Sequence, residues 1–257
     1  MRTVTATRYV SPLREGGSLP AIVEGSDDGL YVLKFRGAGQ GPKALIAELV
    51  AGEIARACGL PVPEIVFMTL DPELARTEPD PEIQELIRAS GGLNLALDYL
   101  PGSVTFDPLV EPPAAPLASA VVWFDAFVSN MDRSARNTNL LVWHRQLWLI
   151  DHGAALYFHH AWDQALERSA APFPLIRDHV LLGFAAALPE ADATLAPRLT
   201  EPLLRGIVDL IPDEWLAADT PFASPAEHRD AYLHYLLRRL EAPRRFAEEA
   251  VNARARL

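Results

Sequence analysis

The side chains best suited to chemistry in this chain lie in one segment, residues 129–153. Asp132 is followed five positions later by Asn137, and Asp151 begins an Asp-His-Gly sequence further on. A carboxylate can orient or accept the proton of an attacking hydroxyl group. Amide and carboxylate oxygens are hard ligands that suit Mg²⁺. This combination is typical of phosphoryl transfer, in which positioning and charge neutralisation supply most of the catalysis.

The residues between Asn137 and Asp151 have the pattern of a β-hairpin. Two apolar runs, 140–143 and 147–150, flank a short polar turn, as expected for two paired strands. Each motif alone is common, because an aspartate also caps helices and ends strands. Their order around a hairpin favours a catalytic interpretation, with Asp132 as the base and with Asn137 and Asp151 as magnesium ligands.

Phosphoryl transfer also requires a cation on the phosphates, and Lys34 in the apolar run 30–35 is the natural candidate. The helix that follows offers Glu48 and Glu53 as partners for its ammonium group. The two glutamates are five positions apart, about 140° around a helix, so they cannot both face Lys34. We expect Glu48 to hold the lysine and Glu53 to be solvated. Two alternatives stay open: Lys34 as a solubilising residue of an edge strand, and Lys43 as the phosphate ligand.

Two loops have backbone groups that could contact a nucleotide. Turns rich in glycine can present N–H groups to phosphate, although a plain hairpin turn has the same composition. The turn in question contains Gly16, Gly17 and Ser18. The end of a later strand falls where a hinge would offer backbone groups to adenine. That segment contains Asp98, Tyr99 and Leu100.

Hydrophobic periodicity divides the chain into a β-rich first part and a helical second part. Alternating apolar residues bounded by Gly and Pro predict strands at 3–10, 21–24, 30–35, 64–70 and 93–100. Apolar residues at helical spacing predict helices at 43–58, 82–90, 117–130, 176–187, 201–211 and 225–255. The predicted fold class is therefore α+β, with a β-rich N-terminal lobe at 1–98 and a mainly helical C-terminal lobe at 99–257.

Composition restricts the classes of function. The chain has 257 residues, of which 49% are hydrophobic and 22% charged, enough to bury a sizeable core. No apolar stretch approaches the roughly 18 residues of a membrane span. No secretion signal is evident at the N-terminus, so we expect a cytoplasmic protein with no membrane partner. The net charge of −11 repels polyphosphate backbones, so we expect no direct binding of nucleic acid.

Three further groups of residues are assigned structural roles. Cys58, the single cysteine, lies in an apolar helical pattern and is expected to be a core residue in a reducing compartment. Basic residues near the C-terminus, such as Arg239 and Arg244, alternate with glutamates and predict a solvated helix face. His159 and His160 lack the ligand spacing of a zinc site, so a surface loop is expected there.

Several short stretches of the sequence match one known family. They are Leu33-Lys34-Phe35, Ala47-Glu48-Leu49 with residues 54–64, Asn130-Met131-Asp132 with Asn137, and Ile150-Asp151-His152-Gly153. At these residues the chain resembles the HipA-like kinases, bacterial relatives of the protein-kinase-like fold that also includes phosphoinositide kinases and aminoglycoside phosphotransferases. The resemblance covers roughly residues 15–160, and it implies a two-lobed protein-kinase-like fold.

The resemblance also implies a function, a cofactor and partners. It implies use of ATP and Mg²⁺, a serine or threonine acceptor on a protein, and, by resemblance alone, an antitoxin partner. It further implies that Ser18 could receive a phosphoryl group from its own chain. Asn130 stands where aminoglycoside-type kinases usually carry histidine. Three alternatives stay open: a small-molecule hydroxyl kinase, a pseudokinase that binds nucleotide without turnover, and a structural module with no nucleotide site.

Overall fold

The structure, a computed structural model, describes residues 1–13, 19–39, 41–217 and 220–257. The chain forms two compact units, one made of Met1–Leu49 and Pro63–Gly102 and the other of Val50–Val62 and Ser103–Leu257. Helix α1 (Pro42–Ala57) contributes residues to both units. The sequence-based division after residue 98 assigns 50–62 to the first lobe, and as a statement about folding domains it stays a prediction.

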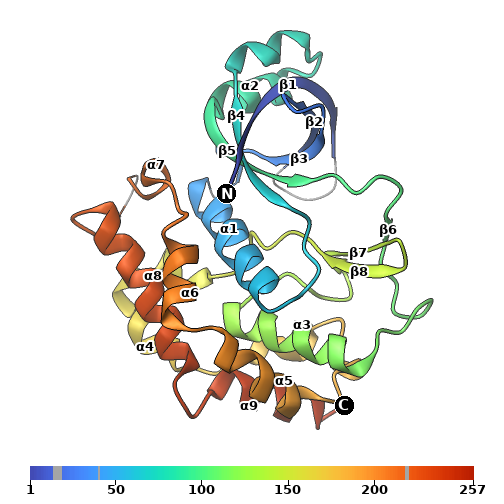
Figure 1. Cartoon of the computed structure of the whole chain (residues 1–257), viewed down its shortest axis with the longest axis vertical. Helices are drawn as coiled ribbons and strands as arrows, with labels where there is room; N and C mark the ends of the chain where they lie inside the picture. The colour runs from blue at the N-terminus through green and yellow to red at the C-terminus, as the bar shows by residue number, and fades with distance from the viewer. Residues whose placement is uncertain (14–18, 40, 218–219) are drawn as a thin grey trace. The chain divides into compact units, whose positions relative to one another are not determined.

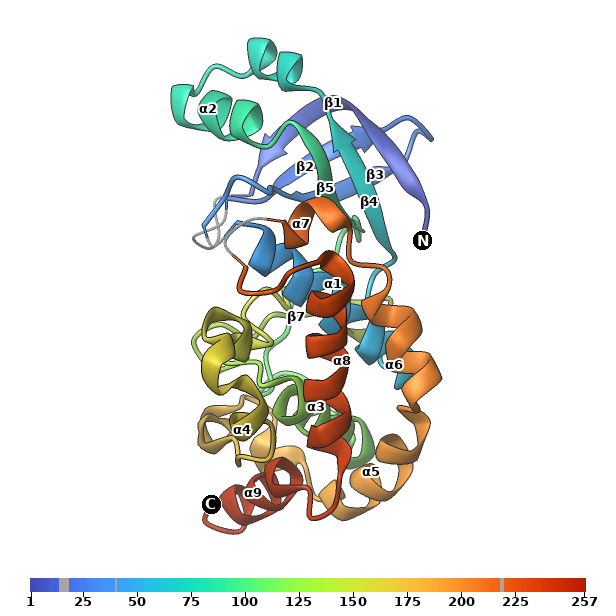
Figure 2. The ribbon, with the colours of Figure 1, turned by 90° about the vertical axis from the view of Figure 1, so that its left-hand side faces the viewer.

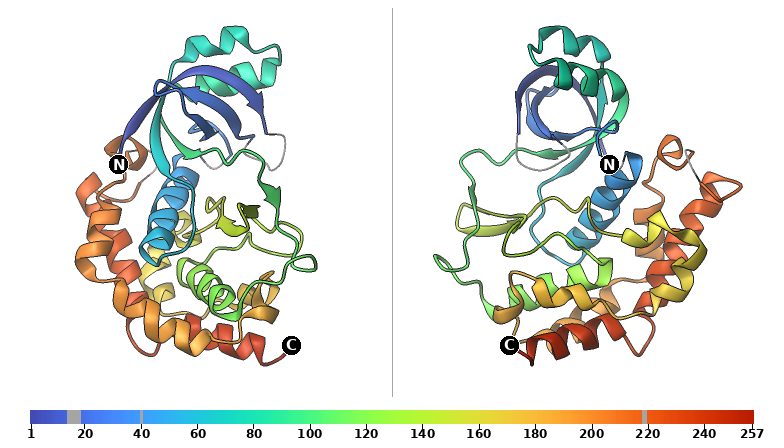
Figure 3. Two further views of the ribbon diagram at one scale, coloured as in Figure 1. Left: turned by 45° about the vertical axis from the view of Figure 1, so that its right-hand side comes forward. Right: turned by 180° about the vertical axis from the view of Figure 1, so that it is seen from behind.

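The first unit is built on a closed five-stranded barrel with the order β1-β2-β3-β5-β4 (Figures 1 and 3). The strands are β1 (Thr3–Pro12), β2 (Ala21–Gly25), β3 (Leu30–Lys34), β4 (Ile65–Leu70) and β5 (Gly92–Asp98). Neighbours pair antiparallel except β1 and β4, which pair parallel. The five strands predicted in the β-rich part of the sequence are confirmed. The parallel pairing of β1 with β4, over Thr3–Thr5 and Phe67–Thr69, closes the sheet into a barrel.

Alternating side chains of the strands fill the barrel. Val23, Leu33 and Val66 point inward and are fully buried. At one end of the barrel lie a 3₁₀ helix, η1 (Pro72–Thr77), and α2 (Pro81–Ala89), whose Ile83 and Ile87 join the same core. Figure 1 shows α2 at this end of the barrel, where it contacts η1, and η1 in turn contacts β1. The helix predicted at 82–90 is confirmed, whereas η1 was not predicted because its residues, with one proline and two charged side chains, show no apolar periodicity.

The second unit is mainly helical and has α3 (Ala115–Val128) at its centre. Ten of the residues of α3 are buried, and it packs against α5 and α9. Figure 2 shows α8 running between α4 and α6. The other helices are α4 (Ala165–Ser169), α5 (Leu188–Leu195), α6 (Glu201–Val208), α7 (Asp213–Leu216), α8 (Pro225–Leu240) and α9 (Arg245–Arg254). The helices predicted at 43–58, 117–130 and 201–211 are confirmed as α1, α3 and α6.

Two predicted helices are wrong in extent. Residues 176–187 form two 3₁₀ turns, η4 (Pro174–Asp178) and η5 (Leu182–Phe184), instead of one α-helix. The N–H of Val180 donates to the carbonyl of Arg133 and not to a helical partner, because this segment pairs with the loop after α3. The predicted helix 225–255 is divided into α8 and α9, since Pro243 cannot continue a helix.

Two predictions about surface residues are also wrong. Arg239 is only 3% exposed, because its guanidinium donates to backbone carbonyls of Ala126 and Phe127 in α3. His159 is buried in a short 3₁₀ helix, with its Nδ1 3.0 Å from the hydroxyl of Tyr232. Both residues are buried in the second unit, and their partners come from segments distant in sequence: backbone carbonyls for Arg239 and a tyrosine hydroxyl for His159.

The single cysteine fits its predicted role. Cys58 is a free, buried thiol, and burial raises its pKa to about 12, which makes it a poor nucleophile. Within the described ranges, no helix combines the length and apolar character that a membrane crossing requires.

Candidate active site

A short hairpin in the second unit brings the two halves of the predicted site together. Strands β7 (Leu140–Trp143) and β8 (Gln146–Leu149) pair antiparallel, and β6 (Val104–Thr105) pairs with β7 on its other side. The turn is tight because His144 and Arg145 both adopt positive φ angles, 49° and 62°.

The open end of this hairpin carries the predicted metal ligands. The N–H of Ile150 donates to the carbonyl of Asn139 at 3.1 Å, so the strands remain paired one residue beyond β8. Asp151 follows directly, and Asn137 lies two residues before Asn139. A hairpin places its first and last residues side by side, and this is how groups fourteen positions apart in sequence reach one location.

Asp132 is held by two amide side chains. Its Oδ2 accepts hydrogen bonds from Nδ2 of Asn137 at 2.8 Å and from Nδ2 of Asn139 at 3.4 Å. Asn139 also donates to the main-chain carbonyl of Asp132 at 2.6 Å. The donating amide of Asn137 leaves its Oδ1 available to a cation. Sequence reasoning missed Asn139, although asparagine tolerates the positive φ of 46° that this position requires.

The electrostatic environment makes Asp132 a stronger base than an ordinary aspartate. Burial and the negative charge of nearby Asp151 raise its pKa, and the hydrogen bonds from Asn139 and Asn137 offset only part of that rise. A divalent cation between the carboxylates would relieve their repulsion, so carboxylate and amide oxygens here fit Mg²⁺. Among the described residues there is no cluster of three or more His, Cys, Asp and Glu side chains that could hold a metal.

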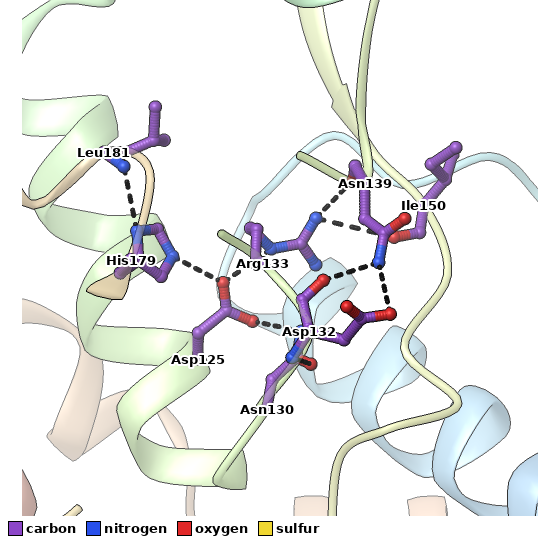
Figure 4. A network of polar contacts seen from close by, with 8 residues as sticks. All are labelled: Asp125, Asn130, Asp132, Arg133, Asn139, Ile150, His179 and Leu181. Carbon is purple, nitrogen blue, oxygen red and sulfur yellow. Dashed lines mark hydrogen bonds and ion pairs between the residues drawn. The ribbon is translucent and has the colours of Figure 1, made fainter. Parts of the chain in front are cut away.

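The loop that carries Asp132 is anchored to α3 through a buried carboxylate (Figure 4). Asp125 accepts hydrogen bonds from Arg133 Nε at 2.6 Å, from Asn130 Nδ2 at 2.9 Å and from His179 Nε2 at 2.9 Å. Burial alone would raise the pKa of Asp125. The positive charge of Arg133 and the hydrogen bond from His179 outweigh burial and hold the pKa well below its usual range.

Sequence reasoning missed this anchor, although it left a signal. Asp125 is the single charged residue of α3, a helix whose other residues from Val121 to Val128 are apolar. A charge inside such a segment requires a buried partner. The sequence therefore indicates that Asp125 has a buried cationic side chain as its partner, but it does not identify Arg133 as that partner.

In the first unit, the predicted lysine and glutamate lie together. Lys34 ends β3, Glu48 lies on α1, and their side chains are 11% and 2% exposed. The ammonium nitrogen is 3.8 Å from Glu48 Oε2. Glu53 faces a different direction, where it is half-buried and 3.5 Å from Arg56 Nε. The choice of Glu48 over Glu53 on helical geometry thus agrees with the distances, while the role of Lys34 in binding phosphate stays a prediction.

The described residues include one of the two segments predicted to contact a nucleotide through the backbone. Gly16, Gly17 and Ser18 lie outside the described residues. At the end of β5, the N–H of Asp98 donates to the carbonyl of Glu64 and that of Tyr99 to the carbonyl of Leu30. These two donors are therefore used in main-chain hydrogen bonds of the first unit, and the contact of the segment Asp98, Tyr99 and Leu100 with adenine stays a prediction.

The family and the solved structures to which this chain is similar are those of kinases. The sequence model for HipA-like kinases matches residues 7–248. No curated protein matches the sequence. Among solved structures, the Helicobacter pylori proinflammatory kinase CtkA is 14% identical, with a TM-score of 0.58 over 99% of this chain and 98% of that one.

The Golgi casein kinase is a second structural relative. It is 13% identical with a TM-score of 0.55, covering 98% of this chain and 72% of the other. A structure of Golgi casein kinase with Mn and ADP bound is 12% identical with a TM-score of 0.51, covering 96% and 76%. At these identities the similarity establishes a protein-kinase-like fold.

Proposed function

Because the chain belongs to the HipA-like kinase family, we propose that it is an ATP- and Mg²⁺-dependent phosphotransferase whose acceptor is a serine or threonine hydroxyl of a protein. The observation that carries this proposal is the group formed by Asp132, Asn137 and Asp151 at one end of the hairpin. It combines a proton acceptor of raised pKa with two oxygen ligands for a hard cation.

In the proposed reaction, the acceptor oxygen forms a bond to the γ-phosphorus of ATP. The bond between that phosphorus and the β–γ bridging oxygen breaks, and ADP leaves with the bonding electrons. Asp132 takes the proton of the attacking hydroxyl, while Asn137 and Asn139 keep its carboxylate in one orientation. Bound Mg²⁺, with Asn137 and Asp151 as protein ligands, would supply neutralisation of the charge on the phosphates.

The nucleotide contacts of the first unit are part of the same proposal. Lys34 supplies a positive charge for the phosphates, and Glu48 holds it in place. Gly16, Gly17 and Ser18, which lie outside the described residues, are proposed to contact the phosphates. The backbone at Asp98, Tyr99 and Leu100 is proposed to contact adenine. The structure of Golgi casein kinase with Mn and ADP supports a role for nucleotide and a divalent metal in this fold.

The acceptor class is inferred from a structural relative and from the net charge of the chain. Golgi casein kinase acts, by its name, on a protein, which favours a protein hydroxyl over a metabolite. A cationic small molecule is the second candidate, because the net charge of −11 attracts cations. A cytoplasmic location fits the buried, reduced Cys58. An antitoxin partner is proposed on family membership alone and is testable by co-purification.

The test measures transfer from [γ-³²P]ATP in the presence of Mg²⁺. Acceptors are the protein itself, casein, a serine and threonine peptide library, and an aminoglycoside panel. Asp132→Asn should lower kcat by about 10²–10⁴-fold with nucleotide binding retained, since it removes a general base. Asp151→Asn should weaken both nucleotide binding and turnover. Asp163→Asn, at an exposed aspartate of the same unit, serves as the matched control.

The outcomes separate the alternatives. Phosphate on protein acceptors that depends on Asp132 supports the proposed function, and transfer to aminoglycosides alone would favour the small-molecule kinase. Binding of Mg²⁺–ATP without transfer to any acceptor would indicate a pseudokinase. Failure of the wild-type protein to bind Mg²⁺–ATP would overturn the proposal.

A further inference from the structure

One buried carboxylate fixes the chain on both sides of the proposed base. Asn130 lies two residues before Asp132 and Arg133 directly follows it, and both side chains bind Asp125. Asn130 also accepts the N–H of Asp132 at 3.1 Å through its Oδ1. The backbone that carries the proposed base is therefore tied to α3 by Asn130, which precedes Asp132, and by Arg133, which follows it (Figure 4).

The guanidinium of Arg133 has a second set of contacts, on the hairpin. Its Nη1 donates to the carbonyl of Asn139 and lies 3.4 Å from the carbonyl of Ile150. Asn139 binds Asp132, and Ile150 directly precedes Asp151. One planar cation thus joins α3, the loop of the proposed base and the strand end that carries the proposed metal ligand.

His179 completes the network from a third segment. Its Nδ1 accepts the N–H of Leu181 at 3.0 Å, so the ring proton resides on Nε2 and is donated to Asp125 at 2.9 Å. The backbone beside it is also bound to the loop, since the N–H of Val180 donates to the carbonyl of Arg133 at 3.1 Å. This pairing explains why residues 176–187 do not form the helix that their periodicity predicts.

Stability alone does not require a buried ion pair of this kind. Asp125 and Arg133 are completely buried, and replacing a buried ion pair by apolar residues is often neutral or stabilising. The helical unit also contains Arg239, which is buried and donates to four backbone carbonyls without contacting the loop or the hairpin. Of these two arginines, Arg133 alone binds residues adjacent to the proposed base and metal ligand.

We propose that Asp125, Arg133 and His179 are positioning residues for phosphoryl transfer, and that Arg133 sets the separation between Asp132 and Asp151. This inference rests on the proposed function of the site. The guanidinium is suited to the task because its planar fork reaches a carboxylate on one side and two carbonyls on the other. A lysine keeps the charge but cannot span both sets of acceptors.

The test compares Arg133→Lys with Arg239→Lys, two substitutions that retain charge at buried arginines of one unit. We expect both to lower the melting temperature. Arg133→Lys should also lower kcat and raise the Mg²⁺ concentration for half-maximal activity, each by about 10–100-fold, as for other residues that orient metal ligands. Arg239→Lys should leave kcat and the Mg²⁺ requirement of the folded protein unchanged. If Arg133→Lys changes only the melting temperature, the inference is wrong.

A second variant and a binding measurement cover the other outcomes. The double variant Asp125→Asn, Arg133→Lys should show a smaller fold-loss of activity than the product of the fold-losses of the two single variants, because both substitutions act through one contact. A fold-loss equal to that product would contradict the inference. If the wild-type protein transfers no phosphoryl group, Mn²⁺ binding with ADP is followed by electron paramagnetic resonance. Weaker Mn²⁺ binding in Arg133→Lys alone would uphold the positioning role while the proposed transferase function fails. Equal Mn²⁺ binding in all variants, or none in the wild type, would overturn the inference.

Discussion

Each unit of the protein holds a buried ion pair, and the two pairs are built differently. Lys34 Nζ lies 3.8 Å from Glu48 Oε2, beyond hydrogen-bond distance, and the lysine side chain retains some contact with solvent. Arg133 and Asp125 lie 2.6 Å apart with no exposure at all. A lysine is a compact charge on a flexible stem, whereas an arginine is a rigid fork with several donors.

The difference matches the two tasks proposed for these pairs. A lysine that binds phosphate must turn toward a nucleotide that binds and dissociates. Because Lys34 is 3.8 Å from Glu48, it loses little free energy when it turns away from the glutamate. The residue that orients a catalytic loop must not move, and Arg133 is fixed by contacts with three acceptors. We therefore expect the pair at Asp125 to dominate stability and the pair at Lys34 to tolerate change in the absence of nucleotide.

The largest effect should come from Asp125→Ala. Removing one partner of a fully buried pair leaves the guanidinium of Arg133 without its counter-charge, which costs about 3–5 kcal/mol of the free energy of unfolding. Urea denaturation followed by circular dichroism measures this loss. A change below about 1 kcal/mol, the size typical of exposed pairs, would contradict the picture of a rigid anchor.

Glu48→Ala should have the second-largest effect, a loss of roughly 1–3 kcal/mol in the same measurement. The loss should be smaller than for Asp125→Ala because the side chain of Lys34 is 11% exposed and its ammonium can gain hydration. A loss equal to or larger than that of Asp125→Ala would remove the distinction between the two pairs.

Acid should weaken the Asp125 anchor within a defined range of pH. Its folded-state pKa lies well below the ordinary value, so the unfolded chain binds more protons as the pH falls. The stabilisation is complete above the ordinary aspartate pKa near 3.9 and is lost below it by about 1.4 kcal/mol per pH unit. Stability measured in urea at several pH values should show this loss in the wild type and not in Asp125→Asn. Parallel pH curves for the two proteins would show that the carboxylate does not titrate as inferred.

Glu73→Ala should have the smallest effect, and it tests whether distance or burial decides the strength of a pair. Glu73 lies 2.8 Å from Arg76, closer than Glu48 lies to Lys34, but both residues are more than half exposed. Exposed pairs contribute about 0.2–1 kcal/mol. If Glu73→Ala destabilised the protein more than Glu48→Ala, burial would not be the deciding factor.

Much of the local structure could be predicted from the sequence because it depends on neighbours in the chain. The barrel strands follow from alternation, and the hairpin follows from two apolar runs around a turn. The pairing of Lys34 with Glu48 follows from the period of the helix, which excludes Glu53 from the same face. These features need only the geometry of one strand or one helix.

The failures occur where distant segments supply the partner. The segment 176–187 has helical periodicity, but its backbone donor at Val180 and its side chain at His179 bind the loop after α3. In the sequence Arg239 lies among charged residues, as a surface arginine does. In the structure it is buried and donates to four carbonyls of two other segments. Tertiary contacts override local preference at these positions.

The sequence by itself determined the order and spacing of Asp132, Asn137 and Asp151 and the strands that bring them together, because a hairpin is a local structure. Only the tertiary structure decided that Asp125, Arg133 and His179 form one anchor. Asp125 and His179 are 54 positions apart, and no periodicity links residues whose contact depends on how whole elements pack. The residues proposed for chemistry thus lie in one segment, whereas the anchor that holds them rigid depends on the packing of several segments.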